Sequence, residues 1–369
     1  MKQLTYSVKN YLWGTHGDDS VIRKFIGVHS DEDTTPYAEL WIGTHPNGPS
    51  SLSSTGTSLE DYLSKPLRFL FKILDVEKPL SIQIHPNREL ASALHEKFPL
   101  VYCDPLDKPE LLIALSPFKC MAGFRDLAET LEFLSHIPLL SNFISSPSLS
   151  STQLLFLRLF SIPVPLLEQI ISFLSSLSSF PSSFFSSALS LSLSLSKLYP
   201  TDPTILSPFF LQLYNLSTGD SFFVPPNCIH AYIKGTAIEI MNNSDNVIRA
   251  GLTPKHVDLE LISQILTRSS EVKPHFDLQS KVSPYVTCYS PPSGYSFFQS
   301  YLIDLPCGQS CRFSLSSFVH KTKILFVLSG SAVVNGSDAT VGDAFVFLDD
   351  VVDVGIAEQG FKCVVVVEQ

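Results

Sequence analysis

A glutamine and a histidine stand two residues apart in an apolar run at residues 81–87, which reads Ser-Ile-Gln-Ile-His-Pro-Asn. On a β-strand, Gln83 and His85 point to one face while Ile82 and Ile84 point to the other. A strand with this pattern presents two metal-type ligands to the inside of a barrel. The run therefore favours a β-barrel fold with a site in its interior.

Two further metal-type side chains lie far from this run. Glu110 stands in the segment Lys-Pro-Glu, and His230 ends the segment Pro-Pro-Asn-Cys-Ile-His. A lone histidine is more often a buried core or turn residue than a ligand. Two nitrogen and two oxygen donors taken together fit a divalent first-row metal, so we favour a metal site.

The composition restricts the class of protein. A chain of 369 residues has room for two or three domains, and its 44% hydrophobic and 16% charged residues are typical of a globular protein. The net charge of −10 argues against a nucleic-acid partner. A phosphorylated small molecule remains compatible, because a few cations in one cleft can outweigh the distant field.

The cysteines and the apolar segments bear on the compartment. Seven dispersed cysteines without a paired CxxC spacing fit a reduced cytoplasm, and the N-terminus has no apolar signal region. Residues 169–196 carry no charge, but serines throughout and Pro181 dilute their hydrophobicity below that of a membrane span. We expect a cytoplasmic protein that does not cross a membrane.

The chain changes character along its length. Residues 1–120 and the part after about residue 207 contain short apolar runs separated by Gly, Pro, Asn and Asp, which predict strands. Between them the leucine spacing is moderately helical, and residues 145–196 are rich in Ser, Leu and Phe. Leucine and serine alternate over residues 189–196, which leaves a strand, a tolerant helix and a disordered insertion open. Regular short strands in the C-terminal third predict a jelly roll, with two strands around a glycine turn in residues 324–336.

Several sequence blocks occur together in an order that resembles the type I phosphomannose isomerases of the cupin superfamily. Each block alone is a weak signal, but the joint order is specific. The blocks are residues 10–14, 38–46, 80–87, 108–110, 230–232 and 244–255.

The resemblance implies a mainly β fold, with two cupin-type jelly-roll β-barrels and an inserted α-helical domain. It implies a catalytic domain from residues 1–124 and 203–270, a Ser-rich helical insert at 125–202, and a metal-free cupin-like barrel at 271–369. It also implies one zinc ion per chain, held by Gln83, His85, Glu110 and His230.

The activity implied by the resemblance is the interconversion of mannose 6-phosphate and fructose 6-phosphate through a cis-enediol. This chemistry needs a base near the carbon acid and an electrophile at the oxygens. The implied catalytic residues are Arg249, Glu239, Lys108 and His45. The expected substrate-binding residues are Lys72, Ser81, Lys255, Tyr232 and Asp245.

The choice of base stays open between Glu239 and His45. Glu239 lies nine residues after His230, an odd spacing that puts the two side chains on opposite faces of a continuous strand, and Gly235 predicts a turn between them. A carboxylate in a partly dehydrated cleft would have a raised pKa that suits proton transfer. Trp13 and Trp41 are expected in packing or at the pocket rim.

Two other readings compete with the isomerase. A cupin oxygenase that uses iron is compatible with the ligand set but not with the cations that suit an anionic substrate. A non-catalytic sugar-phosphate binding module would retain the metal for structure. We expect a monomer that binds a sugar phosphate and that has neither a nucleic acid nor a membrane as a partner. Its reaction would feed mannose into GDP-mannose synthesis and glycosylation or into glycolysis.

Overall fold

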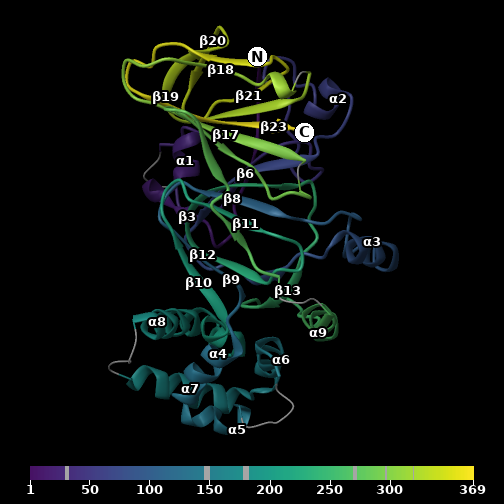
Figure 1. The fold of residues 1–369 in the computed structure, drawn as a ribbon, viewed down its shortest axis with the longest axis vertical. Helices are drawn as coiled ribbons and strands as arrows, with labels where there is room; N and C mark the ends of the chain where they lie inside the picture. Colours follow the sequence, from purple (N-terminus) through teal and green to yellow (C-terminus); the bar gives the residue numbers. More distant parts are fainter. Residues whose placement is uncertain (30–32, 145–149, 178–182, 269–271, 296, 319) are drawn as a thin grey trace.

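The computed structural model describes residues 1–29, 33–144, 150–177, 183–268, 272–295, 297–318 and 320–369. Figure 1 shows an elongated molecule in three layers, with a C-terminal β-structure at one end, a second β-structure in the middle and helices at the other end. Both β-structures consist of antiparallel strands. The expected mainly β fold is thus confirmed.

The middle β-structure is an 11-stranded sheet that curls around the site described below. The order β14-β11-β8-β12-β6-β5-β2 forms its main path, while β9, β10, β7 and β13 branch from β12 and its partners. Its strands are β2 (Ser7–Lys9), β5 (Glu39–Ile42), β6 (Phe69–Val76), β7 (Ile82–Ile84), β8 (Glu110–Ala114), β9 (Phe118–Phe124), β10 (Leu211–Leu216), β11 (Ser221–Val224), β12 (His230–Asn242), β13 (Ile248–Gly251) and β14 (His275–Phe276).

The long strand β12 is the centre of this sheet. It pairs with β7 and β9 through its first half and with β6 and β8 through its second half. Both halves of β12 are buried, and exposed or half-buried residues occur around the middle of the strand and at its last residue. One face of the strand lines a cavity, and the other packs against core side chains. Residues of both halves of β12 therefore reach one cavity.

The segment between β9 and β10 folds into helices, as the leucine spacing predicts. A large apolar cluster joins these helices to β7, β9 and β13. The elements are α4 (Leu127–Ser135), η2 (Pro138–Leu140), α5 (Ser141–Ile144), α6 (Thr152–Arg158), η3 (Leu159–Ser161), α7 (Val164–Ser176), α8 (Ser183–Leu198) and η4 (Pro203–Phe209).

The alternating Leu-Ser stretch lies in α8 and is a helix, one of the three alternatives left open by the sequence. Its buried positions include Ala188, Leu189, Ser192, Leu195 and Ser196, which follow helical spacing. Serine is small enough to sit on the buried face of the helix, and Ser196 satisfies its hydroxyl on a backbone carbonyl of the preceding turn. The buried face of the helix is thus partly made of serine.

The C-terminal β-structure is a 10-stranded sheet with its own apolar interior. Its strands are β1 (Lys2–Leu4), β15 (Gln279–Ser283), β16 (Val286–Tyr289), β17 (Phe298–Leu305), β18 (Cys311–Ser314), β19 (Lys323–Val334), β20 (Ser337–Thr340), β21 (Ala344–Phe347), β22 (Val351–Val354) and β23 (Phe361–Glu368).

One detail of the expected strand pattern is corrected here. Residues 323–334 form the single strand β19, and the turn follows at Asn335 and Gly336. Gly330 does not end the strand, because it takes a positive φ where β19 approaches Gly360 so closely that a Cβ would collide with its carbonyl oxygen. The glycine permits close approach rather than a turn.

Two strands connect the parts that the sequence suggested as separate. The N-terminal β1 pairs with β21 of the C-terminal sheet, and β14 pairs with β11 of the middle sheet. One apolar cluster contains Phe71 and Ile238 of the middle sheet together with Phe326 and Val366 of the C-terminal sheet. The two sheets are therefore packed against each other by a shared core.

Smaller elements complete the fold. They are β3 (Thr15–His16), η1 (Gly17–Asp19), α1 (Val21–Phe25), β4 (Pro36–Tyr37), α2 (Leu59–Leu63), α3 (Arg88–Lys97), α9 (Leu259–Arg268) and η5 (Ser316–Phe318). In the described part of the chain, no single helix has the length and apolarity to span a membrane. The pair Thr152–Ser161 and Val164–Ser176 meets the criterion only jointly and is bent by 115°.

Candidate metal centre and active site

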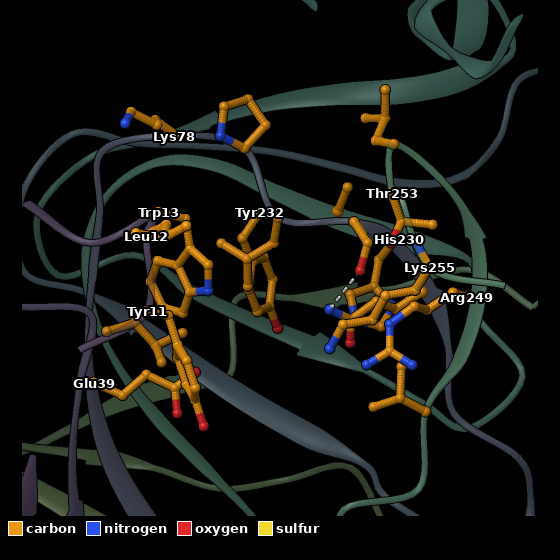
Figure 2. Close-up of a pocket in the computed structure, with 18 of the residues that line it drawn as sticks. Tyr11, Leu12, Trp13, Glu39, Lys78, His230, Tyr232, Arg249, Thr253 and Lys255 are labelled. Carbon is orange, nitrogen blue, oxygen red and sulfur yellow. Dashed lines mark hydrogen bonds between the residues drawn. The ribbon is translucent and has the colours of Figure 1, made fainter. Parts of the chain in front are cut away.

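Three of the four predicted ligands and all of the predicted substrate-binding residues line one large cavity of about 1050 Å³. The fourth ligand, His85, is buried directly beside Glu110. Its wall comes from strands of the middle sheet, from the loop at residues 10–13, from the end of α8 and from the segment after β13. Figure 2 shows Arg249 and Lys255 on the same side of this cavity as His230, with Tyr11, Trp13 and Glu39 across from them.

A row of three residues on neighbouring strands forms one wall. Gln83 of β7 lies directly opposite His230 of β12 and, on its other side, directly opposite Arg249 of β13. Side chains directly opposite each other in an antiparallel pair point to the same face. The register therefore brings a metal-type amide, an imidazole and a guanidinium together from positions up to 166 residues apart.

Glu110 lies at the centre of the buried polar cluster. Its Oε1 is 3.0 Å from Nε2 of His85 and 2.8 Å from Nζ of Lys108. Its Oε2 is 3.5 Å from Nε2 of His230 and accepts a 2.7 Å hydrogen bond from the Tyr232 hydroxyl. The three candidate ligands offer atoms within 4.8 Å of one another, as a metal centre requires.

Backbone carbonyls fix the orientation of both imidazoles. Nδ1 of His85 donates to the carbonyl of Asn246 at 2.8 Å, and Nδ1 of His230 donates to that of Cys228 at 3.0 Å. Each ring therefore turns Nε2 toward Glu110. A carbonyl that accepts from the distal ring nitrogen is the usual support of a metal-binding histidine.

Nε2 of His85 is a buried atom without a hydrogen-bond partner among the described residues. Burial and the nearby charge of Lys108 lower the pKa of His85 to about 4, so this nitrogen carries a lone pair at neutral pH. A lone pair 3.0 Å from a carboxylate oxygen places two acceptors against each other. A cation between them resolves this repulsion, so the residues present fit a metal.

The amide of Gln83 completes the donor set. Its nitrogen donates to the Ser81 hydroxyl at 3.4 Å, which leaves the amide oxygen as the atom available to a cation. Two imidazole nitrogens, one carboxylate and one amide oxygen suit a borderline ion such as zinc.

A second row of side chains forms the opposite wall. Trp41 of β5, Lys72 of β6 and Glu239 of β12 are directly opposite one another in register. Nζ of Lys72 is 3.0 Å from Glu239 and 3.7 Å from Glu39, and Glu39 also accepts a hydrogen bond from the Trp41 indole. One buried lysine thus lies between two buried carboxylates.

The local electrostatics divide these carboxylates into two kinds. Burial would raise the pKa of Glu110, but Lys108 and His85 outweigh it and hold that pKa well below the usual range. Burial and the charge of Glu110 raise the pKa of Glu239 to about 7, against the opposing effect of Lys72. Burial would lower the pKa of Lys72, but Glu239 and Glu39 reverse the shift and raise it. The lowered pKa favours the ionised form of Glu110, whereas the raised pKa of Glu239 lies near neutrality.

A bulge in β12 explains how residues nine positions apart reach one cavity. The register against β9 slips by one residue between Tyr232 and Lys234, and Gly235 follows with a positive φ. One extra residue reverses the alternation of faces, so His230 and Glu239 both line the cavity. The expected turn at Gly235 is wrong, because that glycine continues the strand where it passes against Pro117.

The cations of the cavity differ in their partners. Lys72 and Lys108 are committed to buried carboxylates. Arg249 and Lys255 make no ion pair with any residue that the structure describes, and Ser81 lies on the same cavity wall. Lys78 also lines the cavity without an ion pair among the described residues, so these three uncommitted cations are available to an anionic ligand.

His45 is the expected catalytic residue that does not line the cavity. It is buried beside the Trp41 ring, and its Nε2 is 3.4 Å from Asp245, which does line the cavity. Nδ1 of His45 accepts from the Asn47 backbone, so Nε2 carries the proton directed at Asp245. The position of His45 suits holding Asp245 rather than contacting a ligand.

Two residues of the site were missed by the sequence reasoning. Glu39 is the second carboxylate beside Lys72, and Asn246 supplies the carbonyl that orients His85. A lone acid within the apolar strand Glu39–Ile42 was a usable signal for Glu39, because buried acids are rare without a partner. Nothing local to Asn246 could have identified a backbone contact across 161 residues of sequence.

Comparisons with known proteins agree with this geometry. Residues 1–127 match the model of the phosphomannose isomerase type I catalytic domain. Mannose-6-phosphate isomerase 1 of Arabidopsis thaliana is 32% identical over 89% of this chain and 84% of its own length. The chain belongs to the type I mannose-6-phosphate isomerase family. The human mannose-6-phosphate isomerase is 34% identical over 78% of this chain and 79% of its own.

Solved structures of mannose-6-phosphate isomerases have the same fold over their full length. An apo form from Salmonella typhimurium and a holo form with zinc bound each give a TM-score of 0.80 at 27% identity. Each covers 100% of this chain and 99% of the solved one. The two β-structures and the helical segment are thus common to the isomerase family.

Proposed function

We propose that this chain interconverts mannose 6-phosphate and fructose 6-phosphate by moving a proton between two neighbouring carbons through a cis-enediol. The observation that carries the proposal is the pair of facing walls in one cavity, a metal-type cluster around Glu110 and a buried carboxylate at Glu239. The chemistry needs an electrophile and a base on either side of the same carbons. The family membership supports the same reaction.

We propose zinc as the metal, one ion per chain, held by Gln83, His85, Glu110 and His230. The unpartnered Nε2 of His85 and the mixed nitrogen and oxygen donors support this assignment. When bound, zinc supplies Lewis-acid polarisation of the substrate oxygens. Lys108 and Tyr232 hold the Glu110 carboxylate in place for the ion through their two short contacts.

We propose Glu239 as the base that takes the proton from one carbon and returns it to the other. It is a buried carboxylate on the cavity wall, and its raised pKa suits proton exchange near neutral pH. Lys72 orients the carboxylate through the 3.0 Å contact, and Glu39 and Trp41 hold Lys72. His45 is then a positioning residue for Asp245, and Asp245 contacts the sugar.

The uncommitted cations receive the substrate's negative charges. Arg249 lies directly opposite the proposed ligand Gln83, so it is placed to stabilise the enediolate charge next to the metal. Lys255 and Ser81 line the same cavity and provide a cation and a hydroxyl for the phosphate. Lys72 and Lys108, which the resemblance implies as a substrate-binding and a catalytic residue, contact buried carboxylates.

We also propose a monomer that works in the cytoplasm and supplies mannose 6-phosphate for GDP-mannose synthesis or fructose 6-phosphate for glycolysis. The seven cysteines are all free thiols, the state that a reducing compartment maintains. The catalytic part comprises residues 1–124 and 203–270 with the helical insert between them and the C-terminal barrel after them.

A coupled assay for fructose 6-phosphate formed from mannose 6-phosphate tests the proposal on metal-analysed protein. We expect activity that disappears on chelation and returns with added zinc. Activity that returns with iron but not with zinc would refute the metal assignment. Folded, zinc-loaded protein without isomerase activity would refute the reaction and favour a sugar-phosphate binding module.

A further inference from the structure

A second cavity of about 560 Å³ lies outside the site described above. It shares no lining residue with the larger cavity and is formed by β3, the ends of β6 and β10, residues 116–119 and the bulged part of β12. Its volume is within the range of small-molecule sites. The proposed isomerase chemistry makes no use of it.

Two lysines face each other at this cavity. Lys119 of β9 and Lys234 of β12 are direct cross-strand partners, and both line the cavity. The bulge in β12 creates this pairing, because it shifts the register after Tyr232 so that Lys234 rather than Ile233 opposes Lys119. Like charges directly opposite each other destabilise a sheet.

Neither lysine has a compensating partner among the residues that the structure describes. No side-chain hydrogen bond or ion pair joins Lys119 or Lys234 to any part of the chain that the structure describes. Lys119 is half-buried, and this burial lowers its pKa. Lys234 alone could be an ordinary solvated surface lysine. That interpretation does not account for Lys119, which is half-buried and lies directly opposite Lys234.

Two of the three acidic residues that line the cavity, Asp75 and Glu77, already have polar partners. Asp75 accepts hydrogen bonds from the Thr15, Ser20 and Thr236 hydroxyls and from a backbone amide. Glu77 pairs with His16 at 2.9 Å. Asp19 is exposed. Lys119 is half-buried without a polar partner among the described residues, and Lys234 lies directly opposite it, so an anion between the two lysines would compensate both charges.

We propose that this cavity binds the phosphate group of a small phosphorylated molecule, with Lys119 and Lys234 as its cationic clamp. Two ammonium groups on adjacent strands suit a dianion better than a monoanion, because each can donate to a separate oxygen. The Asn215 amide lines the same space and provides a further donor. The inference concerns a site separate from the proposed active site and does not depend on that function.

The ring of His16 lies in the cavity wall and serves as a reporter. The experiment follows the His16 ring signal by NMR, assigned with the variant H16Q, while the protein is titrated with inorganic phosphate at constant ionic strength. A second titration uses mannose 6-phosphate, which separates free phosphate from a sugar phosphate as the ligand. Sodium chloride serves as the reference for a general salt effect.

We expect a saturable shift of the His16 signal with at least one of the two phosphate compounds. K119Q/K234Q should weaken binding about tenfold or more, because two charge-assisted contacts are lost. The matched control K281Q/K321Q removes two exposed lysines elsewhere and should bind like the native chain. K119Q/K234Q should also raise the thermal midpoint in phosphate-free buffer, since it removes a like-charge pair.

The single variant K234Q decides the matter if the double variant does not fold, because Lys234 is exposed. An unsaturable shift, a shift equal to that with chloride, or equal binding by native chain and K234Q overturns the proposal.

Discussion

Lys72 and Glu239 face each other from neighbouring strands, with 3.0 Å between Nζ and Oε2, inside a wall that also contains Glu39. Both side chains are more than nine-tenths buried. The pair gives Glu239 a fixed direction, and the second carboxylate keeps Lys72 charged when Glu239 takes up a proton. A base with this support can gain and lose a proton without losing its position.

Replacing Glu239 by glutamine preserves shape and removes the base. We expect E239Q to lower kcat by about 10²- to 10⁴-fold, the usual contribution of a positioned acid–base group. Its zinc content should equal that of the native chain, because Glu239 is not among the proposed ligands. The measurement is the coupled assay together with metal analysis. Nearly native kcat in zinc-loaded E239Q would show that another group moves the proton.

The pH profile of the native chain should reveal the same residue. The folded pKa of Glu239 is raised to about 7, and the base must be ionised, so kcat/KM should fall as the pH decreases through neutrality. This decrease of kcat/KM at low pH should be absent from the residual activity of E239Q. If the decrease persists unchanged in this variant, a titratable group other than Glu239 causes it.

Lys72 should matter for stability as well as for activity. K72M leaves Glu239 and Glu39 buried without their shared cation, a change that costs about 3 to 5 kcal/mol when a buried ion pair is broken. We expect a large decrease of the urea midpoint, and K72M/E239Q should recover part of it. The control K281M replaces an exposed lysine on β15. A midpoint for K72M equal to that of K281M would contradict the buried network.

The sequence was sufficient for the fold class because its signals were local. The alternation around Gln83 predicts a strand, and β7 (Ile82–Ile84) contains Gln83 and ends one residue before His85. The leucine spacing predicts the helical segment. The Leu-Ser alternation in α8 was ambiguous, because serine can occupy either a solvent face or a small buried position, and packing against neighbouring helices decides between them.

The site could be predicted only in part, because its geometry depends on register. The spacing of His230 and Glu239 predicts opposite faces, and a one-residue bulge near Lys234 reverses that outcome. No local feature of the sequence predicts this bulge. The hydrogen bond from His85 to the Asn246 carbonyl and the position of His45 beside Asp245 likewise depend on contacts between distant segments.

Tyr232 should control metal affinity without contacting the metal. Its hydroxyl donates to Glu110 at 2.7 Å, and a hydrogen bond of this kind orients a ligating carboxylate. We expect Y232F to weaken zinc binding about 10- to 100-fold, the usual effect of losing such support. Competition with a fluorescent chelator measures this affinity independently of activity.

The matched control for Y232F is Y214F. Tyr214 packs in the same sheet against Phe222 and Phe276, and its hydroxyl makes no hydrogen bond to the residues that the structure describes. Y214F should therefore bind zinc like the native chain. The kcat of zinc-saturated Y232F reports whether the Tyr232 hydroxyl also contacts the sugar. A native kcat together with a weakened zinc affinity would show that Tyr232 supports only the metal site. Equal zinc affinity in the two variants would mean that Lys108 by itself suffices to hold Glu110.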